Sequence, residues 1–262
     1  VQAAWMGYFA TTGLPTMDCI IADERLIPPA EAGQFTERLL YLPDSYVTFA
    51  PPEDAPAPAA PPCFARGHIT FGCFNNAAKL GPGVIRLWAA LLARVPTARL
   101  MLRTGAFGDA GTVARFRNLF HEAGVDPARI DFAGHAQRAA LLAAYNEIDI
   151  ALDPFPFNGG ITSVEALWMG VPVVTKHGDR YCGHHSASSL VSLGLGDLVA
   201  ADDAGYVACA QALAGDRSRL VALRGDMHER FARSTLGNNS RFVRDLEAGL
   251  RRAWAEYCAS GA

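Results

Sequence analysis

The chain has 262 residues, half of them hydrophobic, so it is long enough to bury the core of one large domain or two small ones. Its formal net charge is −3 and no basic stripe is present, which argues against nucleic acid as a partner. No apolar run is long enough to span a membrane and no signal peptide opens the chain, so we expect neither a membrane partner nor secretion.

The cysteines and histidines do not form a recognisable metal or disulfide pattern. His184 and His185 are adjacent, and an i,i+1 pair does not face one site on a helix, so with His177 they do not predict a metal site. Cysteines without paired or CxxC spacing indicate reduced thiols, and we expect the cytoplasm as the compartment. The cysteines are Cys19, Cys63, Cys73, Cys182, Cys209 and Cys258.

The first part of the chain contains little regular periodicity. A Gly/Thr turn lies in Trp5–Gly13, and an apolar strand bracketed by acids lies in Met17–Asp23. Gly33–Leu42 predicts a short helix followed by an extended segment. Residues 44–67 are rich in Pro and Ala, which excludes a regular helix or a central strand and favours a semi-rigid linker. The expected division is residues 1–43, 44–67 and 68–262.

From His68 onward, segments typical of strands and helices alternate. Repeated β-α units predict an α/β fold, with a doubly wound parallel sheet covered by helices on both faces. Such sheets bind ligands at the carboxyl ends of their strands. The predicted strands are 69–74, 99–103, 130–133, 148–152 and 171–175, and the predicted helices are 84–95, 112–123, 137–146, 161–169, 186–193, 202–214, 217–233 and 239–257.

One stretch, from Asp149 to Lys176, combines a buried strand, a glycine-rich turn and a helix. Asp153 stands where the strand should end, and Gly159 and Gly160 allow a tight turn and close approach of a ligand. The free N–H groups and the positive dipole end of the following helix suit a phosphate. Glu165, about one turn into that helix, is placed to meet a sugar hydroxyl. A plain strand–helix crossover with packing glycines gives the same pattern and remains an alternative.

The residues from Asp153 to Thr175 read DPFPFNGGITSVEALWMGVPVVT. They resemble the nucleotide-sugar motif of the O-linked N-acetylglucosamine transferase family, which includes SPINDLY-type and bacterial members. The resemblance extends from Val1 to the C-terminal helices. It implies a GT-B glycosyltransferase in which this chain supplies the Rossmann-like C-terminal half and part of the N-terminal half.

The same resemblance implies what precedes this chain. The sequence begins with Val1, inside a family motif, so we expect an upstream catalytic half that carries the family's candidate catalytic histidine. Tetratricopeptide repeats are also expected upstream, because family members often have them. Scarce lysine and abundant alanine suggest a bacterial gene.

Basic side chains near two predicted strand ends are given roles by the resemblance. Lys79 matches a lysine that contacts the donor phosphates, and Asn76 matches a residue that assists it. Lys79 would therefore be catalytic, since its charge would stabilise the leaving diphosphate. Ala136 and Arg138 lie where the family holds uracil. A solvated surface charge is the alternative for both basic residues.

The phosphate motif departs from the family pattern in one position. Gly159, Gly160, Ile161 and Thr162 stand where the family has glycine followed by hydroxyl side chains. Ile161 lacks a hydroxyl, so we expect phosphate binding there to rely on backbone N–H groups, while Thr162 retains its hydroxyl. Glu165 matches an acidic residue that the family uses for the ribose.

The resemblance therefore implies a transferase that moves N-acetylglucosamine from a UDP-sugar to Ser/Thr of a protein acceptor. The UDP-sugar is a substrate, and neither a metal nor another cofactor is expected. Two alternatives remain open. One is the same fold with another donor such as GDP-fucose, and the other is a non-catalytic fragment that binds a nucleotide or a partner protein.

Overall fold

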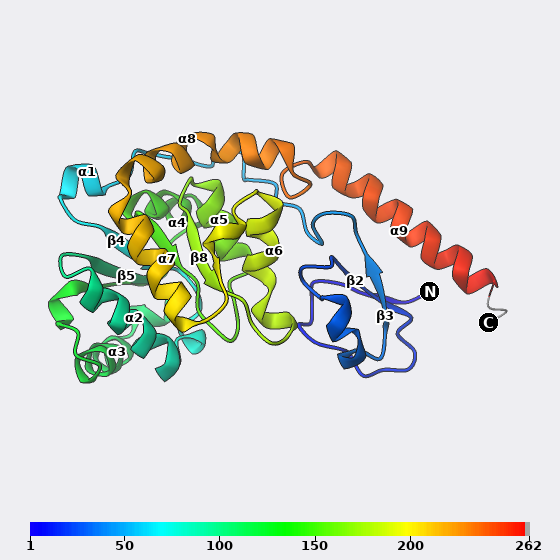
Figure 1. Cartoon of the computed structure of the whole chain (residues 1–262), viewed down its shortest axis with the longest axis horizontal. Helices are drawn as coiled ribbons and strands as arrows, with labels where there is room; N and C mark the ends of the chain where they lie inside the picture. Colours follow the sequence, from blue (N-terminus) through cyan, green and yellow to red (C-terminus); the bar gives the residue numbers. More distant parts are fainter. Residues whose placement is uncertain (260–262) are drawn as a thin grey trace. The chain divides into compact units, whose positions relative to one another are not determined.

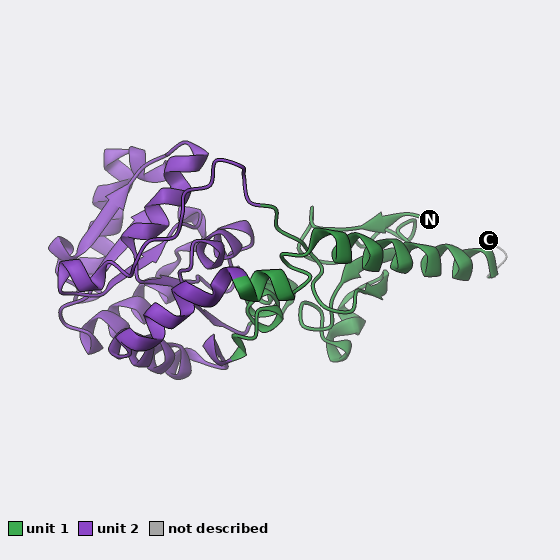
Figure 2. Cartoon of the chain, turned by 90° about the horizontal axis from the view of Figure 1, so that it is seen from above, with its two compact units in different colours: residues 1–50, 178–196, 229–262 green, residues 51–177, 197–228 purple. Residues whose placement is uncertain are grey.

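The computed structural model describes residues 1–259, which form two compact units (Figure 2). Unit 1 contains Val1–Ala50, Gly178–Gly196 and the residues from Glu229 onward. Unit 2 contains Pro51–His177 and Asp197–His228. None of the helices in the described residues is long and apolar enough to cross a membrane.

Unit 2 is built on a six-stranded parallel sheet in the order β6-β5-β4-β7-β8-β9. Figure 1 labels three of its strands, β4, β5 and β8. Numbered within this sheet, the order is 3-2-1-4-5-6, the arrangement of a classical doubly wound fold. The predicted fold class is therefore confirmed, and the strand order reverses between β4 and β7. The strands are β4 (Thr70–Cys73), β5 (Arg99–Arg103), β6 (Ile130–Ala133), β7 (Ile150–Leu152), β8 (Val173–Lys176) and β9 (Val199–Ala200).

The helices of this part of the chain begin close to the predicted positions. In α2, an apolar stripe that includes Trp88 is buried, and the helix packs against α3 and α7. The Trp88 indole N–H donates to the buried Tyr206 hydroxyl of α7 over 3.2 Å. The helices are α1 (Cys63–Arg66), α2 (Pro82–Arg94), α3 (Ala110–Glu122), α4 (Arg138–Ala144), α5 (Ile161–Trp168), α7 (Asp203–Gly215) and α8 (Arg217–Arg233), with short 3-10 helices η2 (Ala77–Lys79), η3 (Gly105–Gly108), η4 (Pro127–Arg129), η5 (Tyr145–Glu147) and η7 (Gly196–Leu198).

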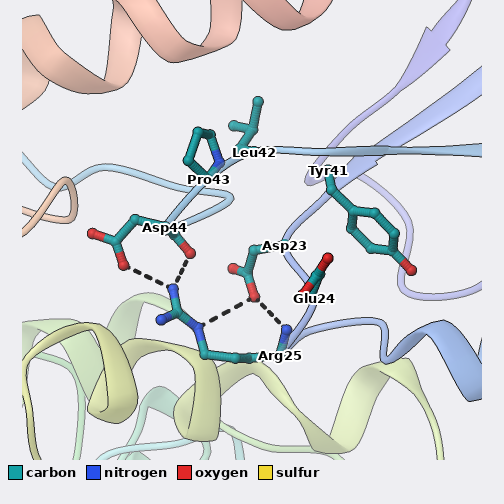
Figure 3. Close-up of a pocket in the computed structure, with 7 residues that line it drawn as sticks. All are labelled: Asp23, Glu24, Arg25, Tyr41, Leu42, Pro43 and Asp44. Carbon is teal, nitrogen blue, oxygen red and sulfur yellow. Dashed lines mark hydrogen bonds and ion pairs between the residues drawn. The ribbon is translucent and has the colours of Figure 1, made fainter.

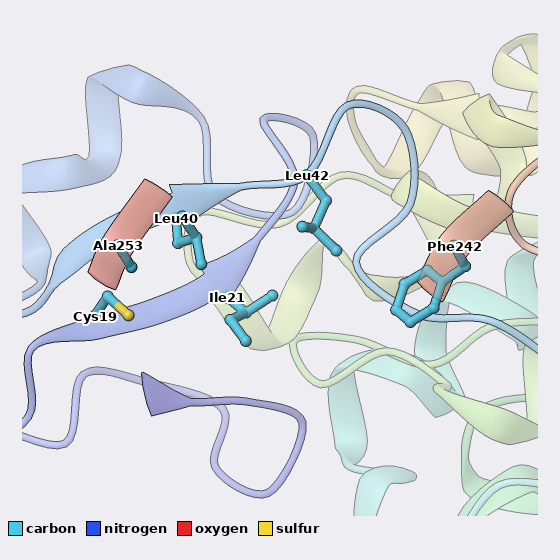
Figure 4. Packing of buried hydrophobic residues seen from close by; sticks show 6 residues of the cluster. All are labelled: Cys19, Ile21, Leu40, Leu42, Phe242 and Ala253. Atoms are coloured by element: carbon cyan, nitrogen blue, oxygen red, sulfur yellow. The ribbon is translucent and has the colours of Figure 1, made fainter. Parts of the chain in front are cut away.

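Unit 1 has a parallel three-stranded sheet in the order β1-β2-β3. Helix α9 packs on it, placing Phe242 and Ala253 in one buried apolar cluster with Cys19 and Ile21 of β2 (Figure 4). A Cβ atom at Gly249 would lie 3.4 Å from Leu42, so the helix approaches the sheet closely there. The elements are β1 (Ala3–Ala4), η1 (Pro29–Gln34), β2 (Cys19–Ala22), β3 (Arg38–Tyr41), η6 (Tyr181–Gly183), α6 (His185–Ser192) and α9 (Asn239–Ala259).

These units do not follow the predicted division into residues 1–43, 44–67 and 68–262. Residues 178–196 and α9, which the sequence assigned to the C-terminal part, cluster with the N-terminal residues. The physical reason is the apolar face of α9, which is buried on β2 and β3. Hydrophobic periodicity predicts that a helix has such a face, but it does not specify which sheet covers it.

Buried carboxylates tie the segments of unit 1 together. Asp23 is 1% exposed and accepts hydrogen bonds from the Tyr46 N–H and the Ser188 hydroxyl, at 2.9 and 2.6 Å. Arg25 lies between Asp23 and Asp44 beside a cavity of about 350 Å³ (Figure 3). Burial opposes ionisation of Asp44, but hydrogen bonds from Thr235 and other neighbours lower its pKa below the usual range. These acids are therefore engaged in holding the fold.

The Gly/Thr turn predicted near the start of the chain is anchored by Glu37. Its carboxylate accepts hydrogen bonds from the Thr11 hydroxyl at 2.7 Å and from the Thr12 N–H at 2.5 Å. Burial raises the pKa of Glu37, but the bonds from Thr12 and Thr11 outweigh it and lower the pKa to about 2. The turn is thus fixed by a carboxylate that stays ionised at neutral pH.

The proline-rich segment is irregular over most of its length, with one departure. Pro62 precedes the four-residue helix α1, which Gly67 ends with a φ of 75°. A helix was not expected there, but proline is compatible with a helix start because its missing N–H would be unsatisfied anyway. Residues 44–50 belong to unit 1 and not to the linker, because Tyr46 and Phe49 are buried there.

We expect limited proteolysis with proteinase K to cut first within residues 51–60. This segment has no helix or strand and exposes Glu53 and Asp54, so it can enter a protease without unfolding a core. Mass spectrometry of the first fragments checks this. Initial cleavage inside α2 or α9, with residues 51–60 intact, would contradict the expectation.

Candidate functional site

The carboxyl ends of β4 and β7 lie side by side where the strand order reverses. The segment after β4 leads to Lys79, and the segment after β7 leads from Asp153 to Gly160 and the start of α5. Open α/β sheets bind ligands at this type of switch point. The topology therefore brings together two of the predicted site segments, which are about eighty residues apart in the sequence.

Asp153 organises the turn between β7 and α5. One carboxylate oxygen accepts from the Gly159 N–H at 2.7 Å and from the Ser163 hydroxyl at 3.3 Å. The other accepts from the Thr175 hydroxyl of β8 at 2.6 Å. From α7, the Tyr206 hydroxyl donates to the Asp153 carbonyl over 3.0 Å. With Asp153 only 2% exposed, these bonds fix the start of α5 relative to the sheet.

The two glycines of the turn have different surroundings. A Cβ atom at Gly159 would lie 2.2 Å from the Ser163 hydroxyl oxygen and 2.9 Å from an Asp153 oxygen, so no side chain fits there. A Cβ atom at Gly160 would have no neighbouring heavy atom within 4 Å. Gly159 is therefore required by packing, whereas Gly160 leaves open space in front of the helix.

The N-terminus of α5 presents free donors to that space. Among the described residues, no hydrogen bond is made by the main-chain N–H groups of Gly160, Ile161 and Thr162. The Ile161 side chain is exposed, and the Thr162 hydroxyl donates to the Asn75 side chain over 3.0 Å. Because Ile161 has no hydroxyl, an anion at this turn would meet backbone N–H groups and the positive end of the helix dipole.

Lys79 reaches this turn from the β4 side. Its ammonium donates to the Asn158 carbonyl at 2.6 Å and to the Asn75 side-chain oxygen at 3.3 Å. It also lies 4.3 Å from the centre of the Phe157 ring. The charge is therefore held against the turn that leads into α5 and does not extend into solvent as a plain surface lysine would.

Asn75 and Asn76 are neighbours in the chain but have different surroundings. The Asn76 side chain is exposed and caps η2 by accepting from the Ala78 N–H at 2.9 Å. Its neighbour Asn75 is 5% exposed and contacts both Lys79 and Thr162. The prediction overlooked Asn75 because its importance depends on Thr162, a partner from another β-α unit.

Two further predicted site residues, Arg138 and Glu165, form an ion pair between α4, which follows β6, and α5. The Arg138 guanidinium, at the start of α4, lies 3.3 Å from the Glu165 carboxylate of α5. The Arg138 side chain is 55% exposed and the Glu165 side chain 4%. Burial raises the pKa of Glu165, and the charge of Arg138 opposes that rise. Ala136 is half-buried in the loop that leads into α4.

We expect Arg138→Ala to raise the pKa of Glu165 further, because the buried carboxylate loses its positive neighbour. A protein loses stability when such a raised carboxyl ionises, that is, as the pH rises from the ordinary pKa of 4.5 through the folded-state pKa. In the variant, this loss should therefore continue to higher pH. Melting temperature measured against pH checks it, with Glu165→Gln as the control that cannot titrate. Identical pH profiles for the variant and the unaltered protein would contradict the role of Arg138.

The enclosed space between these strand ends is small. A cavity of about 10 Å³ is lined by Asn75, Asp153 and Thr162, among others. That volume suits about one water molecule, so a nucleotide would have to bind outside it, in front of α5. Within residues 1–259, no group of three or more His, Cys, Asp or Glu side chains is placed to hold a metal ion.

The two adjacent histidines have structural partners in unit 1. The His184 ring nitrogens lie 2.9 and 3.0 Å from the carbonyl oxygens of Leu26 and Gly178. His185 Nδ1 lies 2.6 Å from the Tyr46 hydroxyl. The pair is buried and takes part in the packing of that unit.

Several known proteins are similar to this chain. The profile described as glycosyl transferase family 41 matches residues 1–50 and 64–246. A relative from Petunia hybrida, described as a probable UDP-N-acetylglucosamine–peptide N-acetylglucosaminyltransferase SPINDLY, is 37% identical over 98% of this chain and 28% of its own length. The UDP-N-acetylglucosamine–peptide N-acetylglucosaminyltransferase of Caenorhabditis elegans is 30% identical over 72% of this chain and 16% of its own length.

Solved structures extend the agreement to the fold. A mutant O-GlcNAc transferase from Thermobaculum terrenum aligns with a TM-score of 0.95 at 37% identity, covering all of this chain and 50% of that one. A sucrose-phosphate synthase from Thermosynechococcus elongatus aligns with a TM-score of 0.62 at 17% identity, covering 93% of this chain and 60% of that one, which supports the fold alone. The chain thus spans only part of its relatives. It belongs to glycosyl transferase family 41, and unit 2 is a Rossmann-like half of the GT-B type.

Proposed function

We propose that this chain provides the donor site of a glycosyltransferase that moves N-acetylglucosamine from a UDP-sugar to Ser/Thr of proteins. The observation that carries the proposal is the contact of Lys79 with the turn that leads into α5, at the switch point of the sheet. The donor and the class of acceptor are those in the names of the family 41 relatives.

The chemistry of the proposed site follows from its charges. The diphosphate would bind to the N–H groups of Gly160, Ile161 and Thr162, with Lys79 beside it. As the glycosidic bond breaks, negative charge grows on the leaving UDP, and the ammonium and the helix dipole would stabilise it. This set of groups supplies positive charge without a bound metal, so we propose that no metal or other cofactor is needed.

The remaining groups would bind the nucleoside. Glu165 would accept a hydrogen bond from a ribose hydroxyl, and Ala136 and Arg138 would contact the uracil. The first role requires an ionised Glu165, and Arg138 favours that state through the 3.3 Å pair. Binding of the ribose should therefore weaken at low pH, where the carboxylate takes up a proton.

We also propose the upstream segments with which this chain acts and the compartment in which it is found. An upstream catalytic half would supply acceptor-binding groups, and upstream tetratricopeptide repeats would contact the protein acceptor. We propose the cytoplasm as the compartment, because all six cysteines, Cys258 among them, are free.

Calorimetry with UDP and GDP on this chain tests the donor site, and a transfer assay on the full-length gene product tests catalysis. We expect UDP to bind more tightly than GDP, and transfer to persist in EDTA. Preference for GDP would support a GDP-fucose donor. Binding of UDP without transfer by the full-length protein would indicate a non-catalytic module, and failure to bind either nucleotide would refute the donor site.

A further inference from the structure

Asn75 is a buried side chain with two partners at the donor site. Its Oδ1 atom lies 3.3 Å from Lys79 Nζ and 3.0 Å from the Thr162 hydroxyl oxygen, while Nδ2 faces the Cys73 sulfur at 3.7 Å. The orientation of the amide is chemically determined, because an ammonium donates hydrogen bonds and never accepts them. The oxygen must therefore face Lys79.

These contacts join the two sides of the switch point. Asn75 lies two residues after the end of β4, whereas Thr162 lies in the first turn of α5. Lys79 is held from the opposite side by the Asn158 carbonyl at 2.6 Å. The amide oxygen of Asn75 and the carbonyl of Asn158 therefore both contribute to the position of the lysine charge.

The chemical type of this residue matters as much as its position. An aspartate at the same place would accept the same two hydrogen bonds more strongly, since charged acceptors form the stronger bonds. It would also neutralise Lys79 and place a negative charge beside an anionic ligand. A neutral amide positions the lysine without placing a further negative charge beside it.

We propose that Asn75 is a positioning residue that holds Lys79 and Thr162 in register for a diphosphate without neutralising the lysine. The inference rests on the proposed donor site and assigns it a residue that the family resemblance did not supply. Asn75 acts through Lys79 and Thr162, so its removal should affect phosphate recognition more than nucleoside recognition.

The test uses this chain with two substitutions, Asn75→Asp and Asn75→Ser, and Asn118→Asp as the control. Asn118 is exposed on α3, so its substitution makes the same change in net charge away from the site. UDP affinity is measured by calorimetry at several salt concentrations, uridine affinity by ligand-observed NMR, and stability by thermal melting. Uridine lacks the diphosphate and reports on the nucleoside pocket alone.

We expect Asn75→Asp to weaken UDP about tenfold or more and to flatten its salt dependence, because the lysine charge is cancelled. Asn75→Ser should weaken UDP several-fold with its salt dependence retained, since no charge is introduced. Uridine affinity should stay unchanged in both, and Asn118→Asp should match the unaltered protein. If Asn75→Asp does not fold, Asn75→Ser decides the question.

Unchanged UDP affinity in both Asn75 variants would overturn the positioning role while leaving the donor site intact. An equal loss of UDP and uridine affinity would also overturn it, since that pattern indicates a general structural role. Failure of the unaltered protein to bind UDP would refute the proposed donor site, and the positioning role with it.

Discussion

Lys79→Ala is expected to lower the turnover of the full-length enzyme by about 10²–10³-fold while changing the apparent KM for the donor much less. Negative charge on the leaving diphosphate increases in the transition state, so the ammonium stabilises that state more than the bound substrate. Steady-state kinetics with varied donor concentration separate the two parameters. The loss should appear in kcat.

The chain offers a matched control for this substitution. Lys176 is the only other lysine, and its ammonium lies 3.8 Å from the centre of the Phe155 ring, two residues from the ring that Lys79 contacts. It also pairs with Asp203 at 2.5 Å. Lys176→Ala should therefore retain nearly full turnover. Full activity of the Lys79 variant would show that the lysine does not stabilise the leaving group.

Gly160→Val should weaken UDP binding by at least about a hundredfold, which corresponds to about 2.7 kcal/mol. Its side chain would occupy the space in front of α5 where the diphosphate is proposed to bind. The melting temperature should change little, because a Cβ atom there meets no heavy atom within 4 Å. Calorimetry with UDP and a thermal melt on the same sample measure both effects.

Gly159→Val is the informative comparison, since its Cβ atom would lie 2.2 Å from the Ser163 hydroxyl oxygen. This neighbouring substitution should lower the melting temperature as well as the affinity. A Gly160→Val protein that melts at a lower temperature yet binds UDP normally would refute the phosphate site.

The alternation of strands and helices in unit 2 could be predicted because each element has its own period of hydrophobic residues. The helix predicted at 161–169 is observed as Ile161–Trp168, and the strand predicted at 171–175 as Val173–Lys176. Gly170, which follows this helix, has a φ of 74°, the left-handed conformation in which a glycine commonly ends a helix. The pattern of residues within such an element is sufficient to predict its type and its approximate bounds.

Pairings between distant segments could not be predicted in the same way. The Arg138–Glu165 pair and the bond from Thr162 to Asn75 depend on which strands are neighbours and how each loop ends. The same limit explains the assignment of α9 to residues 68–262, although its apolar face is buried on β2. A single sequence contains the pattern of such a face but not the identity of the surface that covers it.

The cluster that joins α9 to β2 has a consequence for the order of events during synthesis. Cys19 and Ile21 leave the ribosome more than two hundred residues before Phe242 and Ala253, the side chains that complete their cluster. The sheet of unit 1 therefore cannot complete its apolar cluster until α9 has been synthesised. Until then, the apolar side chains of β2 are exposed while unit 2 is translated. Domains generally fold as units, and transiently exposed strands favour aggregation. We therefore expect the yield of folded protein to depend on translation speed and chaperone supply, because unit 1 is more prone than unit 2 to aggregate before it is complete.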